Sequence, residues 1–589
     1  MLEALDVTST VAYAGREGYE WVSGIARFAV DPLAAANERI VDLELAPRDG
    51  DGLVRFDADV RLLQPAGGGN RKLLFVVANR GFLGGVPFSL DAPLAWGPSD
   101  DLHPGDGFLL EQGWTIAWCG WQWDVLRGPG VLGLTAPEAQ VEPGSMRVEW
   151  RADAPHDDHA LGDSSALFSF ADYPTADLDD PDAVLRVRTG PDGEPEVVPR
   201  ERWRFPDATH VALEGGFQGH HWYELVYRSA TAPVVGTGLL AVRDFVAHLR
   251  PQFDHALGYG VSQSGRFLRQ LVHDGLNVDE SGNQVFDGMF SHVASARRGE
   301  FNHRYAQPSL THVIGPGYGP PYDTASLFAR QRSLGATPKT FFINTAWEYW
   351  RGDAALLHVD ADTGDDLPDD PDARVYLLSG NDHMGTFQLK KSLPTANPVH
   401  QLDTSPVLRA LFVQLDQWAC DGEEPPPSQV PRRSDGTAVE RAEVLARFAH
   451  VATPDPAVLN VTRDLDPDST TWPLELGERK VALVSAVDDD GNEVAGIRLP
   501  AIAAPIAAFT GWNPRVPVDG LPDVLYEFVG SQLPFPPDRP SLDERYPDRD
   551  AYEATARRAA EALAAGRFLL EGDIDRAVAN ALRIYDHAR

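Results

Sequence analysis

Residues 255–266 read HALGYGVSQSGR, and this stretch decides how the middle of the chain folds. Its first six residues are mostly apolar, which is typical of a strand buried on both faces of a parallel sheet. From Gly265 to Leu276 the apolar residues recur at helical spacing, which predicts an amphipathic helix. The sequence therefore predicts a strand that passes into a helix through a very short turn.

Ser262 lies in that turn and is the candidate nucleophile. A serine exposed by a sharp strand-to-helix turn has a strained backbone, so its neighbours two residues away must be small. Gly260 and Ser264 are small, but G-x-S-x-G is not strictly matched, because Ser264 replaces the second glycine and Gly265 follows it. The backbone N–H of Gln263, at the start of the helix, could donate to an oxyanion. The alternatives are a plain strand–turn–helix junction and Ser264 as the nucleophile.

The candidate base follows a later apolar strand. A serine hydroxyl needs a histidine base and a carboxylate that orients it, and the expected chain order is Ser, acid, His. Residues 374–379 (RVYLLS) predict a buried strand, and His383 follows in a loop bracketed by Gly380 and Gly385. Most of the 17 histidines are expected to be ordinary surface or core groups. The loop after a buried strand distinguishes His383 from them.

The candidate acid is Glu348, which follows the predicted strand 340–345 (TFFINT). Its place in the chain, before His383, fits the expected order. Asp353 and Asp382 are alternative carboxylates nearby. Asp382 is adjacent to His383, and the side chains of adjacent residues rarely face each other. Glu348 is therefore preferred.

A second oxyanion donor is expected after the strand predicted at 72–78 (KLLFVVA). That strand ends in Asn79-Arg80-Gly81, and a glycine there would let the backbone approach a substrate closely. The backbone N–H of Arg80 or Gly81 is the candidate donor, and an ordinary strand-exit turn is the alternative.

Aromatic residues near predicted strand ends could line an apolar acyl or aryl pocket, with packing in the core as an equal alternative. They are Trp121, Trp123, Trp347, Tyr349 and Trp350. Arg298, together with Arg297, could bind a substrate carboxylate. A surface or structural pair is the favoured interpretation of these two arginines.

The composition narrows the classes of function. The formal net charge is −36, and so acidic a surface repels phosphate backbones and anionic lipids. We therefore expect neither nucleic acid nor a membrane as a partner. The expected partner, a small-molecule ester, follows from the candidate nucleophile and base and not from the charge. The two cysteines, Cys119 and Cys420, can form neither a disulfide framework nor a cysteine-rich zinc site. The acidic loop 360–365 resembles a calcium site only loosely, so we expect no metal and no cofactor.

The start of the chain bears on its location. Residues 1–15 lack the basic and apolar regions of a secretory signal. No apolar run approaches the ~18 residues of a transmembrane helix. A cytoplasmic location is therefore expected.

The periodicities predict an α/β core with β-rich additions. Residues 1–70 alternate short apolar runs, such as 40–46, with Gly/Asp turns and are interpreted as an N-terminal β-rich region. Residues 71–425 alternate strand-like and helix-like segments, which predicts a mostly parallel sheet with helices on both faces. An insertion at about 136–230 interrupts this rhythm and is interpreted as a cap. Residues 426–589 are expected to form loops and short strands that end in surface helices.

With these residues in place, the chain resembles the bacterial alpha/beta hydrolase domain proteins, a branch of serine esterases with the α/β-hydrolase fold. The resemblance runs over nearly the whole length and implies a hydrolase core with serine chemistry. Where the family usually has Gly-Thr-Gln-His-like residues, this chain has Gly380-Asn381-Asp382-His383, which keeps the base in place. The other segments that carry the resemblance are Asn79-Arg80-Gly81, Gly120-Trp121-Gln122, Ala241-Val242-Arg243-Asp244, Gly260-Val261-Ser262-Gln263-Ser264-Gly265-Arg266, Arg298-Gly299-Glu300-Phe301-Asn302, Glu348-Tyr349-Trp350 and Thr510-Gly511-Trp512-Asn513.

These observations together predict hydrolysis of a carboxylic ester through an acyl-enzyme, with Ser262 as nucleophile, His383 as base and Glu348 as acid. An acyltransferase, a lactonase or an amidase would use the same residues. A catalytically silent protein of this fold that only binds a ligand is the alternative from another class. The complete set of three residues argues against that alternative.

Overall fold

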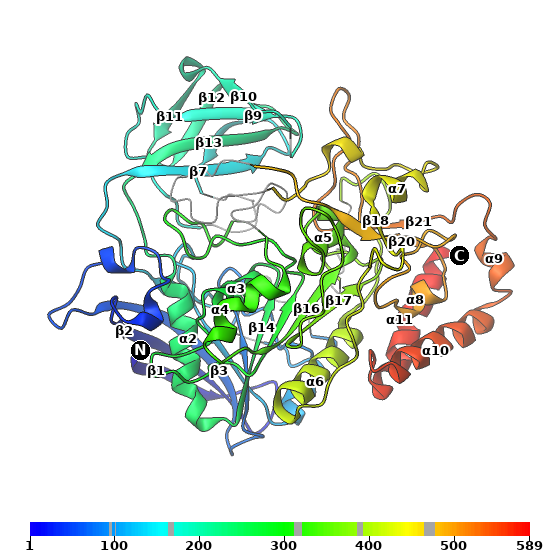
Figure 1. The fold of residues 1–589 in the computed structure, drawn as a ribbon, viewed down its shortest axis with the longest axis horizontal. Coiled ribbons are helices and arrows are strands. Elements are labelled where there is room, and N and C mark those ends of the chain that lie inside the picture. The colour runs from blue at the N-terminus through cyan, green and yellow to red at the C-terminus, as the bar shows by residue number, and fades with distance from the viewer. Residues whose placement is uncertain are drawn as a thin grey trace.

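The computed structural model describes residues 1–92, 97–100, 102–162, 170–191, 193–310, 321–385, 393–463 and 477–589. Its core is a ten-stranded sheet with the order β1-β2-β3-β5-β4-β14-β15-β16-β17, in which β6 pairs with β3 (Figure 1). The strands of this sheet are β1 (Leu2–Ala12), β2 (Tyr19–Val30), β3 (Val54–Pro65), β4 (Lys72–Val76), β5 (Thr115–Cys119), β6 (Leu134–Thr135), β14 (His255–Val261), β15 (Gly288–His292), β16 (Lys339–Thr345) and β17 (Ala373–Leu378).

The N-terminal strands extend this sheet and do not form a separate one. β1, β2 and β3 pair antiparallel, and β3 pairs antiparallel with β5. Residues 1–70 therefore share one sheet with the core, through backbone hydrogen bonds that the local pattern did not reveal. The prediction of a strand at 40–46 is wrong, because Leu43–Leu45 form a 3₁₀ turn. Asp42 precedes that turn with a φ of 64°, a left-handed conformation that ends extended backbone.

The rest of the sheet is parallel and is covered on both faces, which confirms the predicted α/β class. Adjacent residues of β15 point to opposite sides of the sheet. The Phe290 ring faces Phe412 of α6, whereas the Ser291 hydroxyl donates to the carbonyl of Gly265 in α3. The helices of the chain are α1 (Phe108–Glu111), α2 (Thr237–Leu249), α3 (Gln263–His273), α4 (Thr324–Ser333), α5 (Ala346–Arg351), α6 (Ser405–Asp421), α7 (Arg441–Ala446), α8 (Pro500–Ala503), α9 (Leu542–Arg545), α10 (Arg549–Ala565) and α11 (Ile574–Ala588).

The insertion forms a β-lobe of its own at the top of Figure 1. Its strands pair in the orders β10-β9-β13-β7 and β11-β12-β8. Trp150 joins the two sheets, since its ring stacks on His159 at 4.1 Å and meets Phe217 at 5.3 Å. The strands of the lobe are β7 (Gly144–Arg151), β8 (His156–Ala160), β9 (Val184–Arg188), β10 (Glu196–Val198), β11 (Trp203–Asp207), β12 (His210–Phe217) and β13 (Trp222–Ser229).

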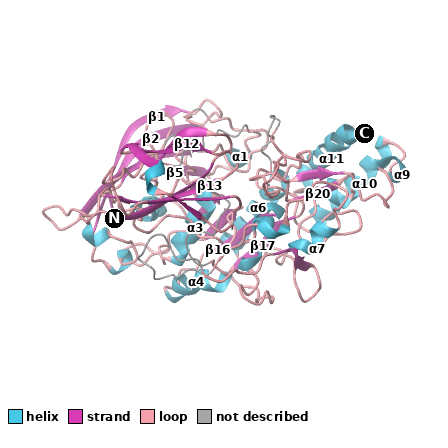
Figure 2. Cartoon of the chain, turned by 90° about the horizontal axis from the view of Figure 1, so that it is seen from above, coloured by secondary structure: helices cyan, strands magenta, loops and turns pink. Residues whose placement is uncertain are grey.

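The C-terminal third packs against the far edge of the sheet. Residues Gln429 and Ile497 form parallel bridges to Tyr376 and Leu378 of β17, so that edge strand is covered. Helices α9 to α11 lie at the opposite end of the molecule from β1 and β2 (Figure 2). The strands of this region are the pairs β18 (Ala438–Glu440) with β19 (Leu483–Ser485) and β20 (Ala508–Thr510) with β21 (Ser531–Leu533).

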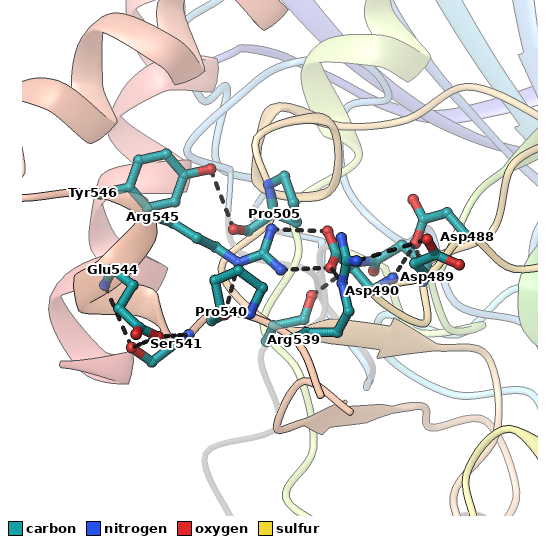
Figure 3. A network of polar contacts seen from close by, with 12 residues as sticks. Asp488, Asp489, Asp490, Pro505, Arg539, Pro540, Ser541, Glu544, Arg545 and Tyr546 are labelled. Carbon is teal, nitrogen blue, oxygen red and sulfur yellow. Dashed lines mark hydrogen bonds and ion pairs between the residues drawn. The ribbon is translucent and has the colours of Figure 1, made fainter. Parts of the chain in front are cut away.

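A network of charged side chains ties this region together. The carboxylate of Asp490 accepts hydrogen bonds from Arg539 Nε at 2.7 Å and from Arg545 Nη1 at 2.9 Å (Figure 3). Asp490 lies in the turn before Glu493, and Arg545 lies at the end of α9. The turn that carries Glu493 is thereby anchored to the C-terminal helices.

Candidate active site

Ser262 lies at the junction of β14 and α3 with a strained backbone. Its φ is 56° and its ψ is −114°, outside the regions that L-residues ordinarily occupy. A turn of this kind presents the side chain at the carboxyl end of the sheet. Ser262 remains partly exposed, so its hydroxyl is not sealed in the core.

Two glycines make this turn sterically possible. A Cβ at Gly260 would lie 2.3 Å from the carbonyl oxygen of Ser264. A Cβ at Gly265 would lie 3.0 Å from the carbonyl oxygen of Gly260. Ser264 itself is fully buried, and its hydroxyl accepts from Val261 N at 2.9 Å and donates to Val261 O at 3.0 Å. This engaged hydroxyl weighs against Ser264 as the nucleophile.

The structure brings the imidazole of His383 to the serine. His383 Nε2 lies 3.0 Å from Ser262 Oγ, and His383 Nδ1 lies 2.5 Å from Glu348 Oε1. When Nδ1 donates to the carboxylate, Nε2 is left to accept the proton of the serine hydroxyl. Three side chains that are far apart in the sequence therefore form one continuous line of hydrogen bonds.

Glu348 is held rigidly at the start of α5. Its Oε2 accepts hydrogen bonds from Thr345 N at 2.8 Å and Thr345 Oγ1 at 2.6 Å, which form a capping box. The side chain is completely buried. Burial alone would raise the pKa of Glu348, but the nearby His383 and Arg351 lower it below its usual value. The carboxylate is therefore ionised and oriented toward the ring.

The two alternative carboxylates are engaged elsewhere. Asp353 accepts hydrogen bonds from Arg351 Nε at 2.8 Å and Nη2 at 2.9 Å. Asp382 accepts from the backbone N–H groups of Gly385 at 2.9 Å and Gly530 at 3.2 Å. Asp353 therefore balances a buried arginine, and Asp382 shapes the loop that carries His383.

Two residues that the sequence did not single out lie against this loop. The Phe528 ring lies 4.8 Å from the His383 ring, and Trp347 lies 5.3 Å from it. Glu493 accepts a hydrogen bond from Gly380 N at 2.8 Å. Burial raises the pKa of Glu493 to about 8, which keeps it largely protonated at neutral pH. Neither Phe528 nor Glu493 is part of a motif, so only the tertiary structure could identify them.

The proposed oxyanion donors lie side by side. Gln263 is the first residue of α3, where backbone N–H groups have no helical partner. The backbone N–H of Arg80 donates to Gln263 Oε1 at 3.2 Å, so this donor is already engaged. A Cβ at Gly81 would lie 2.7 Å from the side chains of Val125 and Val131. Gly81 is therefore required for close packing of this loop.

The Arg80 side chain is anchored to a neighbouring loop. Its Nε donates to Ser309 O at 3.0 Å, and Nη2 donates to Leu310 O at 3.1 Å. Ser309 in turn donates from its backbone N to Asp124 at 2.9 Å. Burial raises the pKa of Asp124 to about 6. No sequence pattern indicates Asp124 or Ser309, because the two residues lie 185 positions apart, on either side of the inserted lobe.

The aromatic pocket candidates separate into two groups. The Trp347 ring is fully buried but contacts His383, and Trp123 Nε1 donates to Ala306 O at 3.2 Å from a partly exposed position. Trp121, Tyr349 and Trp350 are buried and pack in the core, which favours the packing alternative for these three. Their partners are Phe267 for Trp121, His358 for Tyr349 and Trp512 for Trp350.

Arg298 lies with Arg297 on the wall of a cavity that begins one helical turn beyond Ser262. Its guanidinium lies over the Tyr322 ring at 4.2 Å. Within the described ranges, no cluster of three or more His, Cys, Asp or Glu side chains has the geometry of a metal site. Likewise, none of the helices described here is long and apolar enough to cross a membrane.

Comparison with known proteins identifies the family of the chain. A family model described as "Alpha/beta hydrolase domain" matches residues 239–579. No curated protein matches the chain.

Five chains of solved structures match, and three of the proteins show how distant the likeness is. A glucuronoyl esterase from Solibacter usitatus is 12% identical over 59% of this chain and 69% of its own, with a TM-score of 0.26. An S-formylglutathione hydrolase from Agrobacterium tumefaciens is 8% identical over 63% and 89%, with a TM-score of 0.22. Brefeldin A esterase, a bacterial homologue of human hormone-sensitive lipase, is 10% identical over 58% and 63%, with a TM-score of 0.18.

Proposed function

Because the chain belongs to the alpha/beta hydrolase domain family, we propose that it is a serine esterase that hydrolyses a carboxylic ester through an acyl-enzyme. The observation that carries this proposal is the line of hydrogen bonds from Ser262 through His383 to Glu348. A buried carboxylate, an imidazole and a partly exposed hydroxyl in that order are the groups that nucleophilic acyl transfer needs.

The first step forms the acyl-enzyme. Ser262 Oγ attacks the ester carbonyl while His383 Nε2 takes its proton, which gives a tetrahedral intermediate. Glu348 stabilises the imidazolium through Nδ1. The imidazolium then gives its proton to the leaving alkoxide, and the alcohol departs. The strained backbone of Ser262 keeps the hydroxyl in position for this attack without a further rearrangement.

The negative charge of the intermediate requires backbone donors. We propose the N–H of Gln263 as one donor, at the start of α3, and the loop of Arg80 and Gly81 as the second. The Arg80 N–H donates to Gln263 Oε1. If the Arg80 N–H is to bind the oxyanion, it must exchange its hydrogen bond with Gln263 for one with the substrate.

The second step releases the acid. A water molecule gives a proton to His383 Nε2 and attacks the acyl carbonyl, and the returning proton restores the hydroxyl of Ser262. An alcohol or an amine in place of water would make the same chemistry an acyl transfer. Product analysis with and without an added alcohol separates hydrolysis from transfer.

The test of the proposed function is replacement of the nucleophile. We expect Ser262→Ala to lose at least about 10³-fold in turnover of a para-nitrophenyl ester. It should also lose covalent labelling by a fluorophosphonate, because Ser262 is the only hydroxyl that contacts His383 Nε2 among the residues that the structure describes. Rates and labelled peptides are measured by spectrophotometry and mass spectrometry, with thermal unfolding as the check on folding.

Two matched serine variants complete the test. Ser281→Ala changes an exposed loop serine and should leave turnover and labelling as in the wild type. Ser264→Ala removes the hydroxyl that braces the turn and should be less stable but still labelled at Ser262. Labelling that disappears in Ser264→Ala and persists in Ser262→Ala would assign the chemistry to Ser264.

A further inference from the structure

A small cavity lies beside the candidate active site, with about 20 Å³ open to the centre of a water-sized sphere. Three arginines and one carboxylate contribute to its wall, which makes it cationic in an otherwise acidic protein. We name it the Arg266 cavity. It is lined by Arg266, Arg297, Arg298, Gly299, Glu300, Phe301, Gln307, Pro308 and Leu310.

Residues that line the Arg266 cavity also form hydrogen bonds with Ser262 and with the segments beside it. Arg266 lies one helical turn after the serine, and its N–H donates to Ser262 O at 3.0 Å. The carbonyl of Pro308 accepts from the Gln263 side chain, and the carbonyl of Leu310 accepts from Arg80 Nη2 at 3.1 Å. The cavity therefore adjoins both segments proposed to bind the oxyanion.

Arg266 is buried without a counterion. Only 9% of its surface is exposed, and its guanidinium makes no hydrogen bond or ion pair with any residue that the structure describes. Burial, together with the positive charges of Arg351, Arg297 and Arg80, lowers the pKa of Arg266 well below its usual range. Because arginine stays protonated in proteins, its position is electrostatically unfavourable until an anion approaches.

The carboxylates near Arg266 already have partners. Asp353 is held by the fork of Arg351 at 2.8 and 2.9 Å. Glu300 accepts from Gln307 N at 2.6 Å and lies 3.8 Å from His303 Nε2. A buried guanidinium normally has a carboxylate or phosphate partner. The partner of Arg266 is therefore to be sought outside the described chain.

We propose that the Arg266 cavity binds a carboxylate of the substrate, so that the preferred substrate is an ester that also carries a free carboxylate a few bonds from the scissile bond. The planar fork of arginine matches a carboxylate in a bidentate geometry. The proposal rests on the proposed esterase function and names its substrate class.

The kinetic test compares two esters of equal chain length. Para-nitrophenyl hydrogen glutarate carries the carboxylate, and para-nitrophenyl valerate has a methyl group in its place. We expect wild-type kcat/KM to favour the glutarate ester, and Arg266→Gln to reduce that preference at least about tenfold, mainly through KM. Arg266→Lys keeps the positive charge but not the planar fork. Its preference for the glutarate ester should lie between those of the wild type and Arg266→Gln. Equal rates for both esters in the wild type, or an unchanged preference in Arg266→Gln, would overturn the proposal.

Arg332→Gln is the matched arginine control. Arg332 lies on α4, forms ion pairs with Asp370 and Asp372, and does not line the Arg266 cavity. It should keep the wild-type preference for the glutarate ester. Loss of the preference in this variant too would mean that net charge, and not the Arg266 cavity, selects the ester.

A binding test needs no turnover. In the Ser262→Ala variant, glutarate should raise the unfolding temperature, and addition of Arg266→Gln should abolish that rise. Inorganic phosphate is the second probe, and stronger Arg266-dependent stabilisation by phosphate than by glutarate would overturn the assignment to a carboxylate. Because this readout is independent of catalysis, a failed esterase assay with intact glutarate binding would reject the proposed function and keep the anion site.

Discussion

The carboxyl of Glu493 lies 113 residues from Gly380 in the sequence and accepts its backbone N–H at 2.8 Å. Burial raises its pKa to about 8, and a protonated carboxyl can accept this hydrogen bond without placing a charge in the core. Gly380 begins the loop that carries His383. At the scale of single residues, the position of the base thus depends on a neutral acid from another part of the chain.

We expect Glu493→Gln to change how stability depends on pH. The carboxyl holds its proton in the folded state up to about pH 8 but loses it near 4.5 when unfolded. Its contribution to the free energy of unfolding is therefore full below pH 4.5 and is lost as the pH rises toward 8. The glutamine variant should lack this loss and should differ from wild type by less than about 1 kcal/mol near pH 5. Chemical denaturation of both proteins across this range is the measurement, and parallel curves would contradict it.

At the scale of one element, the turn between β14 and α3 depends on two glycines. Ser262 adopts a φ of 56° in a turn where Gly260 and Gly265 leave no room for a Cβ atom. A Cβ atom at Gly260 would clash with the carbonyl oxygen of Ser264. A Cβ atom at Gly265 would lie close to the carbonyl oxygen of Gly260. The glycine that follows Ser264 therefore supplies close packing at the third residue after the serine, where the G-x-S-x-G pattern expects it at the second.

We expect Gly260→Ala to displace the turn, because its Cβ would lie 2.3 Å from the backbone oxygen of Ser264. Fluorophosphonate labelling of Ser262 should slow by about 100-fold, the cost of a small misplacement of a reacting group. Gly258→Ala in the same strand is the matched control, since its Cβ would first meet the flexible end of Leu268 at 3.3 Å. Equal labelling rates in the two variants would refute this account of the turn.

At the scale of the whole molecule, the C-terminal third completes the site. The His383 ring contacts both Trp347, from α5, and Phe528, from the segment before β21. The two aromatic rings also face each other, with centroids 5.5 Å apart. The base is therefore enclosed by two regions that are separate in the sequence.

Phe528→Ala should leave the His383 imidazole in the site but hold its orientation less firmly. We expect kcat for a para-nitrophenyl ester to fall between about 10- and 100-fold with little change in KM, because the loss concerns orientation. Phe535→Ala, whose ring lies over Arg545 at 4.2 Å, removes a similar ring from the same segment and should retain kcat. A rise in KM alone for Phe528→Ala would instead place this ring in substrate binding.

The sequence by itself determined the class of the fold and the local form of the turn at Ser262. A strand that runs into a helix, apolar runs of strand length and small residues at the turn are short-range signals, because sterics and periodicity act over a few residues. The family model and the parallel sheet confirm the class of the fold, and the structure has the predicted turn from β14 into α3 at Ser262. The roles of Ser262, His383 and Glu348 stay predictions until they are tested.

Only the tertiary structure decided how the additions and supports are arranged. Hydrogen bonding between β3 and β5 joins the N-terminal region to the core sheet, and Phe528 and Glu493 reach the His383 loop from the far end of the chain. The packing of distant segments also buries Arg266 where no described carboxylate pairs with it. Contacts between distant segments depend on how whole elements pack, and no local pattern of residues encodes which distant group will fill a given space.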